Sequence, residues 1–488
     1  MTRPTHRPTW TLAVASAAGF MNSLDTQVIS TALPTLRREL GGSVEQLEWT
    51  MNAYSLAIAC LLITSAGLGD RFGRRRVLTI GLSVFAVASA AAALAADPVS
   101  LIAARAVQGA GAAAIMPMSL AVISEAYPPS TRGRAIGIWG AVLGIGGTLG
   151  PVIGGFLLEL TGWRGIFWIN VPVGVLAAIA ARLTVTETYG PRQRLDIRGA
   201  VLAAVGFLAL AAGLIRASGT EWGDPSVWVP LALGILVLGA FVWAEHRARA
   251  PMMPTSLFEN PRFSAATAAT LLHYAGVAGA VFFVSQFFQI AQRADPLTAA
   301  LEFIPWPLPV LILSPWVGSL ATRFGRRRFL AAGMLLQGIG MAWLALVAGP
   351  STPYVAILPS LLIAGVGLSC FLPTIAAEVV GVVPHERMSI AAGVNNSVAQ
   401  VGVVLGVAVI ATVFAHNGSY ANPGTFTSGF VSAIWVSACL AFAAAAVIAV
   451  VAVGRRGARQ ARRARGARRA RRARGARTVS DTALTSSA

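Results

Sequence analysis

The fold of this chain is decided by the stretch Gly67-Leu68-Gly69-Asp70-Arg71-Phe72-Gly73-Arg74-Arg75-Arg76-Val77-Leu78, which lies between two long apolar segments. A degenerate copy begins 252 positions later and reads Ser319-Leu320-Ala321-Thr322-Arg323-Phe324-Gly325-Arg326-Arg327-Arg328-Phe329-Leu330. The same offset carries Gly150 and Gly154 onto Gly402 and Gly406, and an offset of 256 carries Gly109 and Gly111 onto Gly365 and Gly367. Landmarks that agree in this way indicate a structural unit used twice rather than a coincidence of Ala/Gly/Arg-rich sequence.

Composition places most of the chain in lipid. Of its 488 residues, 56% are hydrophobic and only 12% are charged, which is too apolar for a soluble globular protein of this size. Segments of about 20 apolar residues, the length that crosses a bilayer core, recur along the sequence. We therefore predict an all-α membrane protein with fourteen transmembrane helices. The expected spans are 10–34, 49–68, 77–96, 100–124, 134–158, 165–185, 196–216, 227–245, 263–290, 298–321, 328–348, 354–377, 390–415 and 428–453.

The repeat also predicts how these helices are grouped. The copied stretch follows the second span and then the tenth, although a duplicated six-helix unit would place it after the eighth. The seventh and eighth spans therefore read as a pair inserted between two six-helix bundles, a parallel duplication that many transporters use to build a central site. The predicted segments are a cytoplasmic N-terminus at 1–9, an N-terminal bundle at 10–185, the inserted helices with their flanking loops at 186–262, a C-terminal bundle at 263–453 and a tail at 454–488.

Arginines predict the orientation, because the cytoplasmic loops of membrane proteins are enriched in basic residues. With the N-terminus inside, the inner loops hold the arginines of both repeated stretches, and the outer loops hold few. The outer ones are Arg37, Arg38, Arg164, Arg216 and Arg293. We expect a multi-pass protein of the cell (inner) membrane with both termini in the cytoplasm.

The net charge of +19 would by itself suggest nucleic-acid binding, but its location argues against that partner. Twelve arginines lie between Arg455 and Arg477, and most of the others lie in loops between spans. We predict a disordered tail that helps to fix topology. Contact of this Arg-rich tail with anionic lipid head groups is the alternative.

Four motifs complete the pattern. The first span contains Leu24-Asp25-Thr26 and Ala32-Leu33-Pro34, and the loop after the second span contains Gly-x-x-Asp-Arg-x-Gly-Arg-Arg. The fourth span contains Arg105-x-x-Gln108-Gly109-x-Gly111. The fifth span contains Gly150-Pro151 with Gly154 and Gly155. In these motifs and across all the expected spans, the chain resembles the fourteen-spanner drug:proton antiporters of the major facilitator superfamily. The resemblance implies the major facilitator fold and efflux of drugs or antibiotics coupled to protons.

Asp25 and Arg105 are the two charges that lie well inside expected spans. A charge at mid-span costs about 3 kcal/mol on insertion scales and usually faces a cavity or a partner. We therefore predict that Asp25 takes up and releases the coupling proton. Arg105 stays charged, so we expect it to bias the protonation of a nearby acid. A hydrogen-bonded structural acid, and a structural arginine bound to backbone carbonyls, are the alternatives.

Two further motifs predict conformational roles. In the fifth span, Gly140, Gly144, Gly150, Pro151 and Gly154 form a face without side chains, which permits close helix contact and a kink, either for antiport or for general packing. In the loop after the second span, we expect Asp70 to pair with arginine side chains or with a helix end, so that the loop acts as a gate. The preference of cytoplasmic loops for basic residues is by itself enough to explain the arginines. The predicted gating residues are Gly69, Asp70, Arg71, Gly73, Arg74 and Arg75.

Weaker candidates are polar side chains within or at the edge of spans, which could line a cavity or join helices. They are Gln108, His273, Gln286, Gln289, Glu302, Asn395 and Gln400.

The sequence contains no phosphate-binding loop, metal-ligand cluster or hydrolytic triad pattern, so we predict a transporter rather than an enzyme, with no cofactor or metal and a proton gradient as energy source. The expected partners are a small-molecule substrate, protons and the lipid bilayer. The first hypothesis is proton-coupled export of hydrophobic or cationic small molecules. The alternatives are a dedicated exporter of one endogenous metabolite or antibiotic and, more remotely, a non-transporting membrane sensor.

Overall fold

A computed structural model of the chain describes residues 8–450, except 191–195, 218, 222, 249–252, 254, 385 and 386. Within that part the chain is helical and contains no strand. The N-terminal half comprises α1 (Pro8–Leu40), α2 (Val44–Phe72), α3 (Arg74–Ala93), α4 (Pro98–Ala126), α5 (Pro129–Thr161), α6 (Trp163–Trp168) and α7 (Asn170–Thr184). The predicted tail at 454–488 lies outside the described residues, as do residues 1–7.

The remaining helices follow in the predicted order. The inserted pair is α8 (Ile197–Ala217) and α9 (Pro225–Arg247). The C-terminal half comprises η1 (Thr255–Leu257), α10 (Pro261–Gln286), η2 (Phe287–Ala291), α11 (Pro296–Phe303), α12 (Leu308–Phe324), α13 (Arg326–Val347), α14 (Tyr354–Gly381), α15 (Met388–Asn417) and a last helix, Pro423–Val450.

Thirteen helices among the described residues are long and apolar enough to cross a membrane, which confirms the predicted membrane class. Each contains or overlaps one of the expected spans from 49–68 onward. The first expected span lies within α1, whose 33 residues are long enough but include Asn22, Asp25 and Gln27 near the middle. The count of fourteen stays a prediction, and so do the residue boundaries of the predicted segments.

Local sequence explains where the helices begin and end. The Ser43 side chain caps α2 together with Gln46, and Asp97 caps α4 ahead of a proline at the first helical position. The expected span 298–321 differs, because it divides into α11 and α12 around Ile304–Pro307. Pro305 and Pro307 have no N–H group to continue the α-helical hydrogen bonds, which accounts for the break.

The predicted repeat is present in the packing. A Cβ on Gly111 in α4 would lie 2.8 Å from the carbonyl oxygen of Gly81 in α3, and one on Gly367 in α14 would lie 2.4 Å from that of Gly333 in α13. Gly81 and Gly333 are themselves 252 positions apart. Helices three and four of each half therefore touch backbone to backbone at matching residues, which only glycine permits at such distances.

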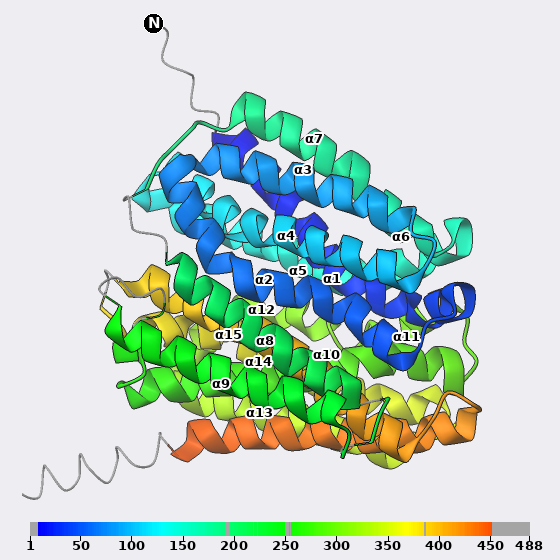
Figure 1. Cartoon of the computed structure of the whole chain (residues 1–488). Coiled ribbons are helices and arrows are strands. Elements are labelled where there is room, and N and C mark those ends of the chain that lie inside the picture. Colours follow the sequence, from blue (N-terminus) through cyan, green and yellow to red (C-terminus); the bar gives the residue numbers. More distant parts are fainter. Residues whose placement is uncertain are drawn as a thin grey trace, which may run out of the picture.

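The two halves join at one end of the molecule and have separate cores at the other. A single hydrophobic cluster contains Leu24 and Leu36 of α1 together with Phe283 of α10 and Phe414 of α15. Toward the end where α1 begins, one cluster lies wholly in the N-terminal half and another lies wholly between residues 257 and 448. In Figure 1 the joined end is at the right, and the end with separate cores is at the left.

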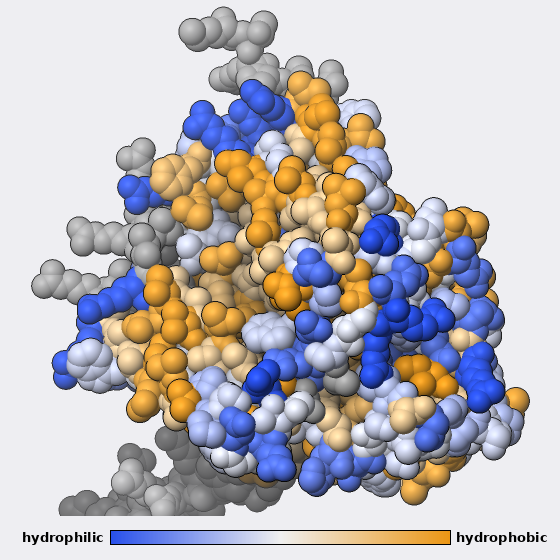
Figure 2. Space-filling model, turned by 45° about the vertical axis from the view of Figure 1, so that its right-hand side comes forward, coloured by the Kyte–Doolittle hydropathy of each residue, from blue (hydrophilic) through white to orange (hydrophobic). Residues whose placement is uncertain are grey.

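The inserted pair lies against the line where the halves meet. Ala211 and Ile215 of α8 share a core with Leu56 of α2 and Ala408 of α15, so one helix contacts both halves. The α9 span is the least buried of the thirteen candidates. Exposed aliphatic and aromatic side chains also cover α3, α7 and α13, and Figure 2 shows hydrophobic side chains over much of one face. Such an apolar exterior suits contact with lipid.

Candidate functional site

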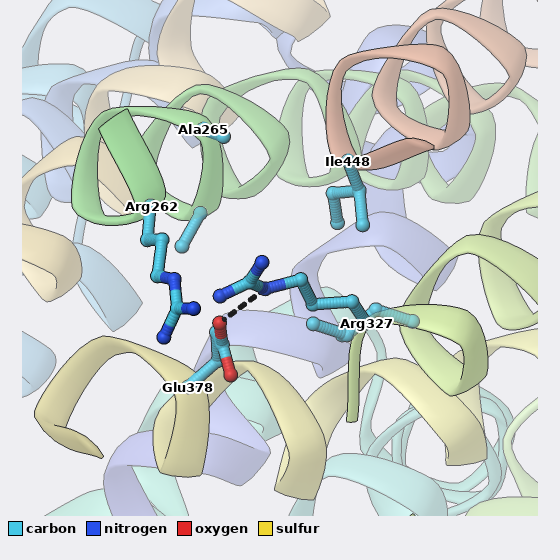
Figure 3. Close-up of a pocket in the computed structure, with 7 residues that line it drawn as sticks. Arg262, Ala265, Arg327, Glu378 and Ile448 are labelled. Carbon is cyan, nitrogen blue, oxygen red and sulfur yellow. Dashed lines mark hydrogen bonds and ion pairs between the residues drawn. The ribbon is translucent and has the colours of Figure 1, made fainter. Parts of the chain in front are cut away.

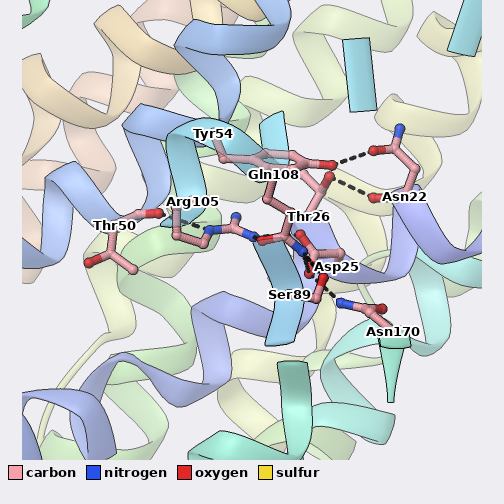
Figure 4. A network of polar contacts seen from close by, with 9 residues as sticks. All are labelled: Asn22, Asp25, Thr26, Thr50, Tyr54, Ser89, Arg105, Gln108 and Asn170. Atoms are coloured by element: carbon pink, nitrogen blue, oxygen red, sulfur yellow. Dashed lines mark hydrogen bonds and ion pairs between the residues drawn. The ribbon is translucent and has the colours of Figure 1, made fainter. Parts of the chain in front are cut away.

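The two charges predicted within spans form a buried ion pair (Figure 4). Arg105 Nη1 of α4 lies 2.5 Å from Asp25 Oδ2 of α1, and both side chains are only 1% exposed. Arg105 also donates from Nε to the carbonyl oxygen of Thr50 in α2 at 3.2 Å. A buried pair of this kind holds together only when further hydrogen bonds satisfy both partners.

The other oxygen of Asp25 accepts two amide donors. Gln108 Nε2 donates to Oδ1 at 2.8 Å, and Asn170 Nδ2, from the first residue of α7, donates to the same atom at 2.7 Å. Gln108 also donates to Ser89 Oγ of α3 at 2.8 Å and accepts from Arg105 Nη1 at 2.8 Å. One carboxylate therefore links α1 to α4 and α7, and through Gln108 to α3.

Hydrogen-bond donors surround the carboxyl group of Asp25. Arg105 donates to one of its oxygens, and Gln108 and Asn170 donate to the other, so both oxygens act as acceptors. The ion pair also compensates the charge of the buried Arg105 guanidinium. Three helices therefore meet at a single acidic side chain.

Arg105 is held on two aromatic faces. Its guanidinium carbon lies 4.3 Å from the ring centre of Tyr54 in α2 and 5.9 Å from that of Phe167 in α6. Tyr54 in turn donates its hydroxyl to Oδ1 of Asn22, one turn before Asp25 in α1. These contacts stabilise a buried cation by ring quadrupoles and fix its position beside Asp25.

The predicted glycines of α5 divide into two groups. A Cβ on Gly150 would lie 2.8 Å from Gln27 Cβ, and one on Gly154 would lie 2.5 Å from Thr31 Oγ1, so these glycines allow α5 to approach α1 beside Asp25. Gly144 instead faces Leu311 of α12 in the other half at 3.8 Å, and Gly140 has open space. Pro151 lies inside α5 between the two close contacts.

The loop after α2 pairs as predicted and also binds a connecting segment. Arg74 lies 2.8 Å from Asp70 and 3.6 Å from Glu125 at the end of α4. Glu187, which follows α7, accepts the backbone N–H of Arg75 at 2.9 Å and lies 3.5 Å from its side chain. Gly73 joins α2 to α3 with φ 109°, a conformation that favours glycine. Of the other predicted gating residues, Gly69 packs against Met118, and Arg71 lies over the Phe72 ring.

Two of the weaker candidates lie where the halves join. Gln289 Nε2 donates to the carbonyl oxygen of Thr31 in α1 at 3.0 Å. Gln286 accepts the hydroxyl of Tyr420 at 2.8 Å, and the Tyr420 ring lies 3.9 Å from the guanidinium carbon of Arg37 at the end of α1. Burial raises the pKa of the Tyr420 hydroxyl, which therefore remains a donor.

The other weaker candidates lie apart from the Asp25 site. His273 is buried in the C-terminal half and stacks on Phe371 with ring centres 3.8 Å apart. Asn395 Oδ1 accepts from Thr270 at 2.9 Å within the same half. Glu302 and Gln400 are half-buried, in α11 and α15. Among the described residues, no three His, Cys, Asp or Glu side chains gather as metal ligands.

Several members of the network were not predicted. Ser89, Tyr54 and Asn22 are small or amphipathic residues that are common in membrane helices, so nothing in the sequence separates them from packing residues. Asn170 does carry a signal, because an amide inside the apolar stretch 165–185 needs a partner. The identity of that partner depends on tertiary structure.

Comparisons with known proteins agree with this fold. The family model described as Major Facilitator Superfamily matches residues 15–304 and 266–484. The chain is 36% identical to the cephamycin export protein CmcT of Amycolatopsis lactamdurans, over 88% of this chain and 89% of that protein. It is 35% identical to the puromycin resistance protein pur8 of Streptomyces alboniger, over 84% and 82%, and 34% identical to the multidrug resistance protein Stp of Mycobacterium tuberculosis, over 83% and 75%.

Solved structures with the same fold include a D-xylose-proton symporter and a POT family transporter. The symporter has a TM-score of 0.66 and 18% identity, over 90% of this chain and 97% of that chain. The POT family transporter has a TM-score of 0.70 and 14% identity, over 91% and 96%. At these identities the likeness concerns the fold alone.

Proposed function

The chain belongs to the major facilitator superfamily, and we propose that it is a proton-coupled antiporter that exports hydrophobic or cationic small molecules, such as drugs or antibiotics, by alternating access. It is a multi-pass membrane transporter and not an enzyme. Relatives named for antibiotic resistance and export support efflux as the direction of transport. The observation that carries proton coupling is the buried Asp25–Arg105 pair with its two amide donors.

Coupling would pass through α1. Asp25 and Thr31 lie less than two turns apart on this helix, and Thr31 accepts the hydrogen bond from Gln289 of the other half. Proton uptake by Asp25 releases donors from α4 and α7, and α1 is then free to shift against α10. The inter-half contact at the joined end therefore responds to the charge of one carboxylate.

The energy source would be the proton gradient, with no bound cofactor. The end of the bundle where the halves have separate cores also carries the arginines of both repeated stretches, at 74–76 and 326–328. The rule for basic loops assigns that end to the cytoplasm, together with both chain termini. The structure then corresponds to the state whose halves are joined on the outer side, and export requires a second state joined on the inner side.

Export of a single endogenous antibiotic is the second candidate. It is favoured by the relative named as a cephamycin export protein, which is 36% identical to this chain over 89% of its own length. A panel of compounds separates the two candidates, because a broad exporter moves several unrelated cations and a dedicated exporter moves one.

The test uses the full chain in inside-out membrane vesicles and a panel of fluorescent or radiolabelled substrates. With the interior acidified, we expect substrate accumulation that stops when a protonophore collapses the proton gradient. Accumulation that persists unchanged after addition of the protonophore would exclude proton coupling while leaving export intact.

A further inference from the structure

Three buried polar side chains form a cluster inside the C-terminal half. His273 of α10, Gln337 of α13 and Thr374 of α14 are each no more than 1% exposed. Among the described residues, neither ring nitrogen of His273, neither amide atom of Gln337 and not the hydroxyl of Thr374 has a hydrogen-bond partner. Buried polar groups of native proteins nearly always have one, so the cluster calls for a partner that can both donate and accept hydrogen bonds.

Ring stacking and helix contact bring these side chains together. The His273 ring stacks on that of Phe371 in α14 with ring centres 3.8 Å apart, and Thr374 follows Phe371 by one turn. Gln337 lies within reach of the His273 ring. At that level α13 touches α14, because a Cβ on Gly367 would lie 2.6 Å from the backbone nitrogen of Gln337. A direct bond from Gln337 would satisfy only one of the two ring nitrogens.

The N-terminal half has apolar side chains at two of the corresponding positions. Gln337 corresponds to Phe85 by the offset of 252, and Thr374 corresponds to Met118 by the offset of 256. Phe85 and Met118 are both buried in the hydrophobic core of their half. The same fold therefore packs without polar groups at these positions, so the architecture of the bundle does not account for Gln337 and Thr374.

A pocket opens above the cluster, at the end of the bundle that is assigned above to the cytoplasm (Figure 3). Its lining residues are Arg262, Ala265, Ala266, Arg327, Leu330, Glu378 and Ile448. Arg327 Nε donates to Glu378 Oε1 at 2.9 Å, so charged groups that are bound to each other lie at its mouth. The pocket has room for a water molecule rather than for a larger ligand.

The pocket and the cluster lie on the same faces of their helices. Two pairs of residues are seven positions apart, namely Ala266 and His273 in α10, and Leu330 and Gln337 in α13. Seven residues are two helical turns, which is about 10 Å along the axis and nearly the same direction around it. In α14, Glu378 at the pocket is one turn from Thr374. Met334 lies between the pocket and the cluster on α13, and its unbranched side chain changes rotamer readily.

We propose that water enters the C-terminal half through this pocket and binds His273, Gln337 and Thr374. Water supplies what the cluster lacks, because it donates and accepts hydrogen bonds equally. An ion is less suitable, since the other charged residues of α10, α13 and α14 all lie in the turns next to the pocket. The bound water would also bring protons from the cytoplasm to an ionisable ring apart from Asp25. That use rests on the proposed proton coupling, whereas the hydration does not.

X-ray radiolysis of the full chain in lipid nanodiscs tests the proposal, because hydroxyl radicals formed from bound water label the side chain beside it. The readout is oxidation of Phe371, measured by mass spectrometry. Phe85 is the reference, since it is equally buried in the apolar core of the other half. Thr374→Val removes a hydroxyl from the cluster with little change in shape. Thr412→Val is the matched control, because the Thr412 hydroxyl already bonds to the carbonyl oxygen of Ala408 in its own helix.

We expect the labelling of Phe371 to exceed that of Phe85 severalfold, to fall severalfold in Thr374→Val and to stay the same in Thr412→Val. A folding defect would act in the opposite direction, since it exposes both rings and raises the labelling of each. Equal labelling of Phe371 and Phe85 in the parent chain, or unchanged labelling of Phe371 in Thr374→Val, would overturn the proposal. Radiolysis does not require transport, so that outcome leaves the proposed antiport standing. Loss of proton-driven accumulation would in turn leave the hydration standing.

Discussion

Asn170, the first residue of α7, donates from Nδ2 to Oδ1 of Asp25 in α1 at 2.7 Å. The bond joins two helices whose residues lie 145 positions apart, and it reaches the oxygen that the Arg105 salt bridge does not use. Asn170 therefore binds the carboxyl group of Asp25 independently of the arginine.

Replacement of Asn170 by alanine should alter proton-coupled exchange, because the variant loses one of the two amide donors to Asp25. We expect its pH profile to differ from that of the parent chain. The measurement is substrate exchange in proteoliposomes as a function of pH. Asn395→Ala is the control, because that buried amide bonds to Thr270 in the other half and should leave the pH profile unchanged.

Substitutions in α5 should distinguish the glycines that pack closely against α1 from those that face open space. Gly154→Ala places a Cβ 2.5 Å from Thr31 Oγ1, and overpacking of this kind costs about 1–3 kcal/mol. Thermal unfolding in detergent should show that loss, whereas Gly140→Ala meets nothing within 4 Å and should be neutral. Equal melting temperatures for the two variants would contradict the packing of α5 on α1.

The two repeated stretches should contribute unequally to switching. Asp70 binds Arg74 at 2.8 Å, and its backbone carbonyl accepts from Gly190, whereas the corresponding Thr322 is exposed and carries no charge. We expect Asp70→Asn to slow transport more than Thr322→Ala at equal expression, as measured by initial efflux rates. Equal rates in the two variants would show that the acid has no special role in the gate.

The joined end should depend on Arg37. Its guanidinium carbon lies 3.9 Å from the ring centre of Tyr420, so Arg37→Ala removes a contact between the halves. Distances between spin labels at Thr161 and Ser351, in a background without the native cysteines, should broaden toward longer values. Arg38→Ala is the control, because Arg38 bonds to Thr35 within its own helix. A similar broadening in both variants would point to general loss of charge rather than to the Tyr420 contact.

Much of the fold could be predicted from the sequence because each membrane helix can be recognised from its own stretch of residues. Apolar length, the repeated arginine stretch and the glycine offsets all depend on neighbouring residues or on direct comparison of segments. The break at Ile304–Pro307 was not predicted from Pro305 and Pro307, because proline is also tolerated within membrane helices. Pro359 and Pro373, for example, lie inside α14.

The site was predictable only in part, for a different reason. Asp25 and Arg105 are costly in lipid and were therefore visible in the sequence. Their mutual contact, and the choice of Asn170 rather than another amide as the third partner, depend on how α1, α4 and α7 pack. The role of Glu187 likewise became visible only once the segment after α7 was seen to return to the first turn of α3.

The most direct test of the central claim is Asp25→Asn in proteoliposomes, measured with and without a proton gradient. The amide preserves size and can still accept the hydrogen bonds of Gln108 and Asn170, but it loses the ion pair with Arg105 and cannot carry the proton. We expect substrate counterflow without a gradient to persist while gradient-driven accumulation is lost. Full gradient-driven accumulation by Asp25→Asn would contradict the assignment of the coupling proton to this carboxylate.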